Sequence, residues 1–271
     1  MAGFAVANAL DRGRRGFLIP ENCRMPVRVG TGTDVGLKRS QNEDRFAVWR
    51  PEGPDAAARG VLLVVADGMG GAQAGEVASQ LAIDCVLEIY RAGTNSVLDD
   101  LEHAVETANQ VIHEHSRAHP EMRGMGTTCT AVVMQGEAAY FAHVGDSRAY
   151  RVRDGGIEQL THDHSLVAQL VEHRHLTPEQ AKVDPRRNVV TRSVGVAAEV
   201  DVDAAQVDDP LRQGDTLVLC SDGLHTLVED DEIARIASGP DLDLACEQLI
   251  ALANQRGGND NITVVIGRLE R

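Results

Sequence analysis

Two aspartates of this chain stand where an apolar run ends and a glycine follows. Asp67 comes directly after Val61–Ala66, and Asp222 comes directly after Thr216–Ser221. An Asp-Gly pair after a strand is most often part of a turn. Two such pairs after wholly apolar runs indicate more, because strands of this kind lie in the centre of a sheet. Their ends would then place both carboxylates at one rim of a core.

Acidic residues of three further segments could join them. Asp260 lies in the Gly- and Asn-rich segment 257–263, which taken alone indicates a turn with a capping aspartate. Glu43 and Asp44 precede another expected strand, and Asp146 lies in a short turn segment. Clustered carboxylates repel one another unless cations bind between them. Oxygen ligands without thiolate or imidazole suit Mg²⁺ or Mn²⁺.

The sequence gives weaker indications of a zinc site or a nucleotide-binding site. Three histidine pairs have i, i+2 spacing, which does not place two imidazoles on one helix face, and the zinc motif HExxH does not occur. The glycine-rich segment 67–75 could suggest a dinucleotide loop, but it lacks the third glycine and a convincing βαβ unit. A zinc site and a nucleotide site are therefore the minor alternatives.

The elements that must position the acidic residues are short Val-rich strands and three amphipathic helices. Leu81 and Val86 are in phase in the first expected helix, Leu101 and Val105 in the second, and the third covers Leu244–Ala253. Strands precede and follow the first two helices in blocks, which favours an α+β fold over a doubly wound sheet. The expected strands are Arg45–Arg50, Gly60–Ala66, Cys129–Met134, Ala138–Val144, Ala149–Val152, Thr216–Cys220 and Ile262–Ile266. The pair at 138–144 and 149–152 is predicted to form a hairpin across Gly145–Ser147.

Composition excludes some classes of function. The 271 residues carry a formal net charge of −15, which disfavours nucleic-acid binding as the main activity. The longest apolar run, Val61–Ala66, is far below the roughly 20 residues that span a bilayer. The five cysteines are odd in number and form no CxxC pair, so a reducing, cytoplasmic location fits best.

The chain divides unevenly along its length. Residues 1–25 show no core pattern, and we interpret them as an N-terminal extension with room for flexibility. Their start faintly resembles a signal peptide but lacks the positive n-region. The segment 163–195 is mostly polar, with a short amphipathic piece, and is expected to be a flap-like insertion near the site.

Eight segments together resemble the type 2C, metal-dependent protein phosphatases in their bacterial form. They occur in the order of that family and span residues 31 to 268. The segments are Thr33–Asp44, Val65–Gly71, Met125–Thr128, Val144–Arg148, Leu160–Ser165, Val190–Gly195, Leu219–Leu224 and Gly258–Thr263. The resemblance implies a four-layer αββα sandwich with two central antiparallel sheets, formed by a catalytic domain of residues 26–271.

The same resemblance implies a binuclear Mn²⁺ or Mg²⁺ centre at one end of the sandwich. Asp67 looks like the ligand that bridges both metal ions, and Gly68 like a carbonyl ligand of the first. Asp222 and Asp260 look like ligands of the second ion. Asp146 matches the aspartate that bacterial members use for a third.

The resemblance also implies roles for Glu43 and Arg39. Glu43 is similar to the family glutamate that holds metal-bound water, and Arg39 corresponds to the arginine that grips substrate phosphate. Met69 stands where some members, chiefly eukaryotic ones, have a histidine proposed as general acid. Because the methionine side chain cannot donate a proton, the sequence does not identify the group that protonates the leaving alcohol.

The function implied by the resemblance is hydrolysis of phosphoserine and phosphothreonine on proteins. A hydroxide that bridges the two metal ions would attack phosphorus, without a covalent enzyme intermediate. The expected partners are phosphoproteins, including a cognate Ser/Thr kinase and its substrates in signal transduction, and we expect a monomer. The alternatives are a pseudophosphatase that only binds phosphoprotein and a phosphatase of small phosphoesters.

Overall fold

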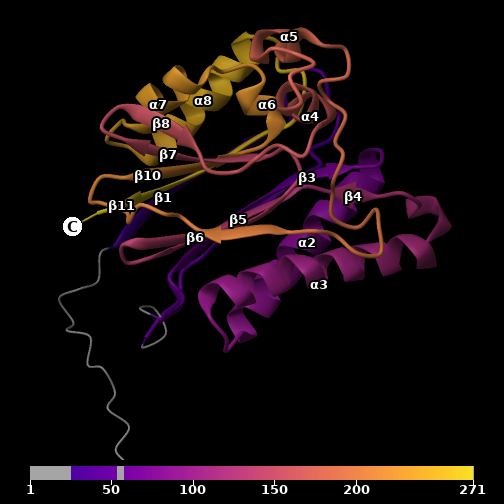
Figure 1. Ribbon diagram of the computed structural model, residues 1–271, viewed down its shortest axis with the longest axis horizontal. Coiled ribbons are helices and arrows are strands. Elements are labelled where there is room, and N and C mark those ends of the chain that lie inside the picture. Colours follow the sequence, from indigo (N-terminus) through magenta and orange to yellow (C-terminus); the bar gives the residue numbers. More distant parts are fainter. Residues whose placement is uncertain (1–25, 54–57, 271) are drawn as a thin grey trace, which may run out of the picture.

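Two antiparallel β-sheets pack face to face at the centre of the molecule, and helices cover both outer faces (Figure 1). The computed structural model describes residues 26–53 and 58–270. The expected extension, residues 1–25, lies outside the described residues. The order of layers confirms the predicted αββα sandwich.

The first sheet joins the two ends of the described chain. Its strand order is β1-β11-β10-β7-β8. These strands are β1 (Val27–Asp34), β11 (Ile262–Leu269), β10 (Thr216–Cys220), β7 (Arg148–Arg153) and β8 (Gly156–Gln159). The helices on its outer face are α6 (Asp222–His225), α7 (Asp230–Ala237) and α8 (Leu242–Gln255).

The second sheet has the strand order β2-β3-β5-β6-β9, with β4 paired to the end of β3. Its strands are β2 (Asp44–Trp49), β3 (Val61–Met69), β4 (Gly126–Thr127), β5 (Cys129–Gln135), β6 (Ala138–Val144) and β9 (Asp203–Gln206). The long helices α2 (Ala72–Ala92) and α3 (Val97–Ala118) cover its outer face, and η2 (Pro120–Met122) follows α3. The predicted helices and strands are thus present.

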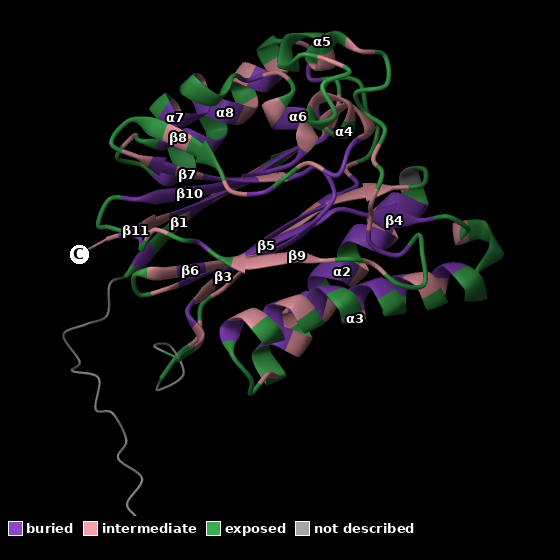
Figure 2. Cartoon of the chain, in the orientation of Figure 1, coloured by how far each residue is buried: buried purple, intermediate pink, exposed green. Residues whose placement is uncertain are grey.

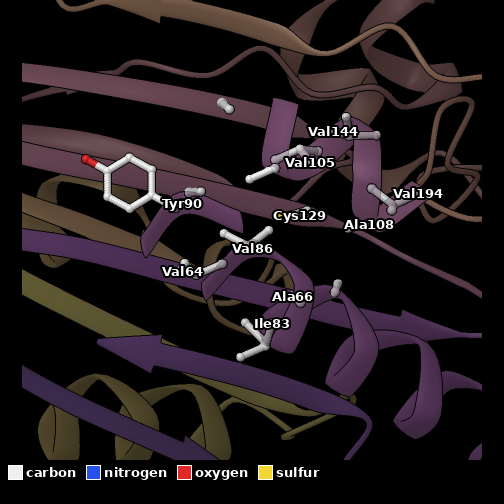
Figure 3. Close-up of a cluster of buried hydrophobic side chains, with 14 of the residues drawn as sticks. Val64, Ala66, Ile83, Val86, Tyr90, Val105, Ala108, Cys129, Val144 and Val194 are labelled. Carbon is white, nitrogen blue, oxygen red and sulfur yellow. The ribbon is translucent and has the colours of Figure 1, made fainter. Parts of the chain in front are cut away.

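Three apolar clusters hold the four layers together. One lies between the two sheets and includes Leu63 and Leu217, and a second lies between the first sheet and its helices. The third lies between the second sheet and α2 and α3, where Val64, Val86 and Val105 meet (Figure 3). Figure 2 shows how burial concentrates along the inner strands. Since β3 and β10 are central in their sheets, their apolar residues are buried on both faces.

The predicted hairpin across Gly145–Ser147 is wrong. Strand β6 pairs with β5 and β9 in the second sheet, whereas β7 pairs with β10 and β8 in the first. Each strand therefore already has neighbours on both edges and cannot pair with the other. The three residues carry the chain from one sheet to the other.

The segment 163–195 leaves the sandwich and returns to it at the same place. It contains α4 (Leu166–Glu172) and α5 (Pro178–Val183), and Thr177 caps α5 by accepting a hydrogen bond from the Gln180 amide. Ser165 and Val190 form an isolated bridge, so the two legs of the segment lie side by side. We call residues 163–195 the flap segment. None of the helices in the described ranges combines the length and apolar character that a membrane crossing requires.

Candidate metal centre

One cavity at the end of the sandwich is lined by all seven residues that the sequence analysis assigned to the site. Its volume is about 340 Å³. The predicted site residues that line it are Arg39, Glu43, Asp67, Gly68, Asp146, Asp222 and Asp260. The expectation that residues from distant parts of the chain converge is therefore met for all seven.

Strand pairing explains how these residues meet. In the second sheet Asp44 at the start of β2 is directly opposite Asp67 near the end of β3. In the first sheet β10 ends where β11 begins, so Asp222 follows one strand and Asp260 precedes its neighbour. Each sheet thus brings acidic residues to the same end of the sandwich.

Thr128 fixes the backbone at Asp67. The Asp67 amide donates to Thr128 Oγ1 at 2.9 Å, and the Asp67 carbonyl accepts from the Thr128 amide at 2.9 Å. Thr127 Oγ1 donates to the same carbonyl at 2.9 Å. The backbone is held in this way, and the Asp67 side chain lines the cavity beside the Asp222 carboxyl group.

Gly68 lies where no side chain fits. A Cβ atom there would come 2.1 Å from the Gly75 carbonyl oxygen and 2.8 Å from the Glu43 carbonyl oxygen. The residue is therefore a glycine because β3 passes close to both β2 and the start of α2. This close approach leaves Gly68 at the cavity wall with only backbone atoms to offer.

The buried carboxyl groups interact strongly with one another. Burial raises the pKa of Asp67 well above its usual range, and the charges of Asp44, Asp222, Asp146 and Asp260 raise it further. Burial raises the pKa of Asp222 in the same way, followed by the charges of Asp146 and Asp260. The pKa values of Asp44 and Asp146 are each raised to about 6, chiefly by burial. Without cations, the centre is thus an unfavourable concentration of negative charge.

Two of the acidic residues have an oxygen that nothing in the described chain satisfies. Oδ1 of Asp222 and Oδ1 of Asp44 are buried without a hydrogen-bond partner among residues 26–53 and 58–270. A buried carboxylate oxygen without a partner is costly unless a cation or water takes that place. The donor set of aspartate and glutamate oxygens with a backbone carbonyl fits a hard divalent cation.

Asn261 ties Glu43 to the other sheet. The Glu43 amide donates to Asn261 Oδ1 at 2.8 Å, and Asn261 Nδ2 donates to the carbonyls of Val35 and Gln41. The neighbour of Asp260 therefore holds the loop that carries both Arg39 and Glu43. Sequence reasoning did not single out Asn261, although it lies inside the motif that contained Asp260.

Asp44 is the main acidic residue that the prediction left without a role. Its side chain is 2% exposed, and Ser221 Oγ donates to its Oδ2 at 2.7 Å. Because Ser221 directly precedes Asp222, this bond joins the two sheets behind the cavity. The wall also includes Thr128, Met69 and Asn188, of which Asn188 belongs to the flap segment and was not predicted.

Arg39 stands at the mouth of the cavity and contacts one of the acidic residues. Its Nη2 lies 2.7 Å from Oδ2 of Asp260. The two side chains are 50% and 25% exposed, so the pair is open to solvent. Such a pair is worth about 1 kcal/mol or less, so the guanidinium is available for another anion at little cost.

A second, larger cavity adjoins the first. Its volume is about 730 Å³, and it lies between the flap segment and the start of α6 and α7. Asp146 and Asp222 line both cavities, so the two spaces meet at these carboxylates. The flap's Lys182 pairs with Glu229 at 2.6 Å across this space.

Comparison with known proteins agrees with this arrangement. A model of the family "Protein phosphatase 2C" matches residues 32–262. The protein phosphatase PhpP of Streptococcus pneumoniae is 38% identical over 246 residues, covering 89% of this chain and 96% of PhpP. The serine/threonine protein phosphatase PstP of Mycobacterium tuberculosis is 38% identical over 242 residues, which are 89% of this chain but 44% of PstP. A solved structure of the PstP catalytic domain with two manganese ions superposes with a TM-score of 0.78 at 36% identity, covering 90% of this chain and 99% of that one.

Proposed function

The chain belongs to the protein phosphatase 2C family, and we propose that its acidic cavity is the active site of a metal-dependent serine/threonine protein phosphatase. The observation that carries this proposal is the meeting of seven predicted residues around one cavity, with an unsatisfied buried carboxylate oxygen of Asp222 in its wall and a second one, of Asp44, behind it. Its substrates would be phosphoserine and phosphothreonine on proteins.

The residues divide into two groups around the cation sites. Asp67, whose pKa is raised by the charges of four other acids, would bind two cations at once. The Gly68 carbonyl would bind the first cation, and Asp222 and Asp260 would bind the second. Bound divalent cations would lower the pKa of a coordinated water and offset negative charge at phosphorus. We favour Mn²⁺ or Mg²⁺, two ions per chain, with Asp146 available for a third.

Arg39 would receive the phosphate of the substrate. A guanidinium can offer two parallel N–H donors to phosphate oxygens, and that of Arg39 gives up only an exposed pair with Asp260 to do so. Glu43, anchored through Asn261, would orient water at the cations from the neighbouring loop. Met69 lines the cavity but cannot protonate the leaving group.

The larger cavity would accommodate the protein part of the substrate, since it opens beside Asp146 and Asp222. The cellular role would be signal transduction in the cytoplasm, opposing a Ser/Thr kinase, with the enzyme acting as a monomer. The catalytic domain would comprise residues 26–271, with the flap segment as an insertion beside the site.

Hydrolysis of two substrate classes tests the proposal. Purified enzyme with Mn²⁺ should release phosphate from a phosphothreonine peptide far faster than from a sugar phosphate at equal concentration. Faster turnover of the sugar phosphate would instead indicate a phosphatase of small phosphoesters. Binding of the phosphopeptide without any release of phosphate would indicate a pseudophosphatase.

A further inference from the structure

The turn that carries Asp146 depends on the glycine before it. Gly145 has φ of +117°, which favours glycine, and a Cβ atom there would lie 2.5 Å from Cγ2 of Thr128. Residues 145–147 also carry the chain between the two sheets. The direction of the Asp146 side chain is therefore set by how the Gly145 peptide is held.

One histidine holds Gly145 from both sides. The Gly145 amide donates to Nδ1 of His164 at 3.0 Å, and the Gly145 carbonyl accepts from the His164 amide at 2.7 Å. His164 is only 5% exposed. Both polar groups of the Gly145 backbone thus form hydrogen bonds with this one residue. His164 lies at the start of the flap segment.

The other ring nitrogen of His164 is also occupied. Because Nδ1 accepts a hydrogen bond, the proton of the neutral ring is on Nε2, which donates to Oδ2 of Asp203 at 3.0 Å. Asp203 also accepts from Nη1 of Arg192 at 2.5 Å. Burial lowers the pKa of His164, which agrees with a neutral ring. A chain of bonds therefore runs from the returning leg of the flap segment to the Asp146 turn.

His164 also binds that returning leg directly. The Thr191 amide donates to the His164 carbonyl at 2.7 Å. On the far side of the turn, His225 Nε2 donates to the Asp146 carbonyl at 2.9 Å. The backbone around Asp146 is thus held at two points. His225 of α6 binds the Asp146 carbonyl, and His164 binds the Gly145 backbone.

We propose that His164 is a positioning residue that directs the Asp146 carboxylate into the metal cavity, and that Asp203 keeps the His164 ring in the tautomer this requires. The inference rests on the proposed function, in which Asp146 binds a cation. His164 itself would touch neither the cations nor the substrate. Partners that orient metal ligands in this indirect way typically change metal affinity or activity by about 10- to 100-fold when removed.

Two amide substitutions at His164 test the two hydrogen bonds of its imidazole ring separately. His164→Asn places an amide oxygen near the position of Nδ1, so it keeps an acceptor for the Gly145 amide and loses Asp203. His164→Gln places its amide near Nε2, so it keeps a donor to Asp203 and loses the Gly145 amide. If the hydrogen bond from the Gly145 amide positions Asp146, His164→Gln should raise the Mn²⁺ concentration for half-maximal activity about tenfold or more. His164→Asn should recover most of this loss.

The measurement is the Mn²⁺ dependence of phosphopeptide hydrolysis by the full chain, with kcat and KM determined separately. Asp146→Asn gives the reference for complete loss of the Asp146 carboxylate, and His173→Asn, at an exposed histidine of the same segment, is the matched control. Thermal unfolding of each variant shows whether it is folded. We expect KM for the phosphopeptide to stay within about twofold, because the substrate-binding Arg39 is elsewhere.

The outcomes are distinguishable. A shifted Mn²⁺ dependence in Asp146→Asn and His164→Gln, with recovery in His164→Asn, supports the inference. A shift in Asp146→Asn without one in folded His164→Gln overturns it and leaves the proposed function intact. Equal loss in His164→Asn and His164→Gln also overturns it, since the Gly145 bond would then not be decisive. If the wild-type protein releases no phosphate with Mn²⁺, the proposed function itself has failed.

Discussion

Nη2 of Arg39 and Oδ2 of Asp260 lie 2.7 Å apart, so the residue expected to bind phosphate is paired with a residue expected to bind metal. The Arg39 guanidinium offsets part of the negative charge at this edge of the cavity. Metal binding at Asp260 would remove the partner of Arg39 and leave it free to meet the substrate. The two steps of assembling the site are therefore linked through this pair.

Arg39→Ala should weaken catalysis without weakening metal binding. Losing a charge-assisted bond to phosphate costs roughly 1.5–3 kcal/mol, or about 10- to 150-fold in kcat/KM. Asp260 would lose a competing cation, so Mn²⁺ affinity should stay the same or rise by a small factor. Phosphopeptide kinetics and calorimetric Mn²⁺ titration check the two effects, with Arg39→Lys as the control that keeps the charge. Weaker Mn²⁺ binding by Arg39→Ala would show that Arg39 supports the metals instead.

Asp67→Asn should make the metal-free protein more stable while abolishing activity. The substitution removes one charge from a buried group of carboxylates that raise one another's pKa. The gain should be roughly 1–3 kcal/mol, the scale of an unsatisfied buried polar group, which corresponds to a rise in Tm of about 2–10 °C. Added Mn²⁺ should stabilise the wild-type protein and leave Asp67→Asn nearly unchanged. Thermal unfolding with and without Mn²⁺ measures both, and a lower Tm for the metal-free variant would contradict the expectation.

Mild acidification should act on the metal-free protein through two opposing groups. Protonation of the raised-pKa carboxyls of the centre stabilises the folded state, whereas the buried His143 and His225, whose pKa values are lowered to about 4 and about 3, oppose it. The pKa values of Asp44 and Asp146 are raised to about 6 in the folded state, above the ordinary value near 3.8. At these two groups the folded state therefore binds more protons between these values, so their contribution to stability is present at low pH and is lost as pH rises through about 6. Metal ligands must be deprotonated, so Mn²⁺ should stabilise more strongly at higher pH. The histidine contribution is the same in chelator and in Mn²⁺, so the stabilisation by Mn²⁺ over chelator, measured by unfolding, should be larger at pH 7.5 than at pH 5.5. An equal stabilisation at both pH values would argue against a carboxylate metal centre.

Gly68→Ala should inactivate the protein. The new Cβ atom would collide with the carbonyl oxygens of Gly75 and Glu43, at 2.1 and 2.8 Å, so β3 would have to move at the cavity wall. Activity should fall by about tenfold or more, as expected when ligand positions shift. Gly156→Ala is a matched control, because its Cβ would meet only the Arg153 carbonyl oxygen at 3.4 Å. Comparable activity of the two variants would show that the approach at Gly68 is not needed.

Removing residues 1–25 should leave metal-dependent turnover nearly intact. The described fold closes without them, since β1 pairs with β11 from Val27 onward and the Glu270 amide donates to the Pro26 carbonyl at 2.8 Å. Turnover and Tm of a protein starting at residue 26 test this. Loss of most activity, or failure to fold, would show that the extension packs on the domain.

The central strands and the acidic residues could be predicted from local patterns. Strands such as β3 and β10 are continuous apolar runs, and the occurrence of two Asp-Gly pairs directly after such runs indicates carboxylates at one rim of the core. The roles of Gly68 and Arg39 come only from the resemblance to the type 2C family. The strands β1, β4, β8 and β9 were not predicted. In β1, Gly, Thr and a charged residue interrupt the apolar ones, and β4, β8 and β9 are only 2, 4 and 4 residues long. Local patterns cannot specify which sheet a strand joins, as the wrong hairpin at Gly145–Ser147 shows. They also give no sign of partners made across the fold, such as Asn261 for Glu43 or His164 for Gly145.

The most direct test of a cation centre built on Asp67 is a crystal structure of the protein soaked in Mn²⁺, with anomalous scattering to locate the metal. We predict two Mn²⁺ ions in the cavity, about 3.5–4 Å apart, both bound by Asp67 and one of them also by Asp222 and Asp260. Anomalous signal absent from this cavity, or a single ion that Asp67 does not bind, would contradict the proposed active site.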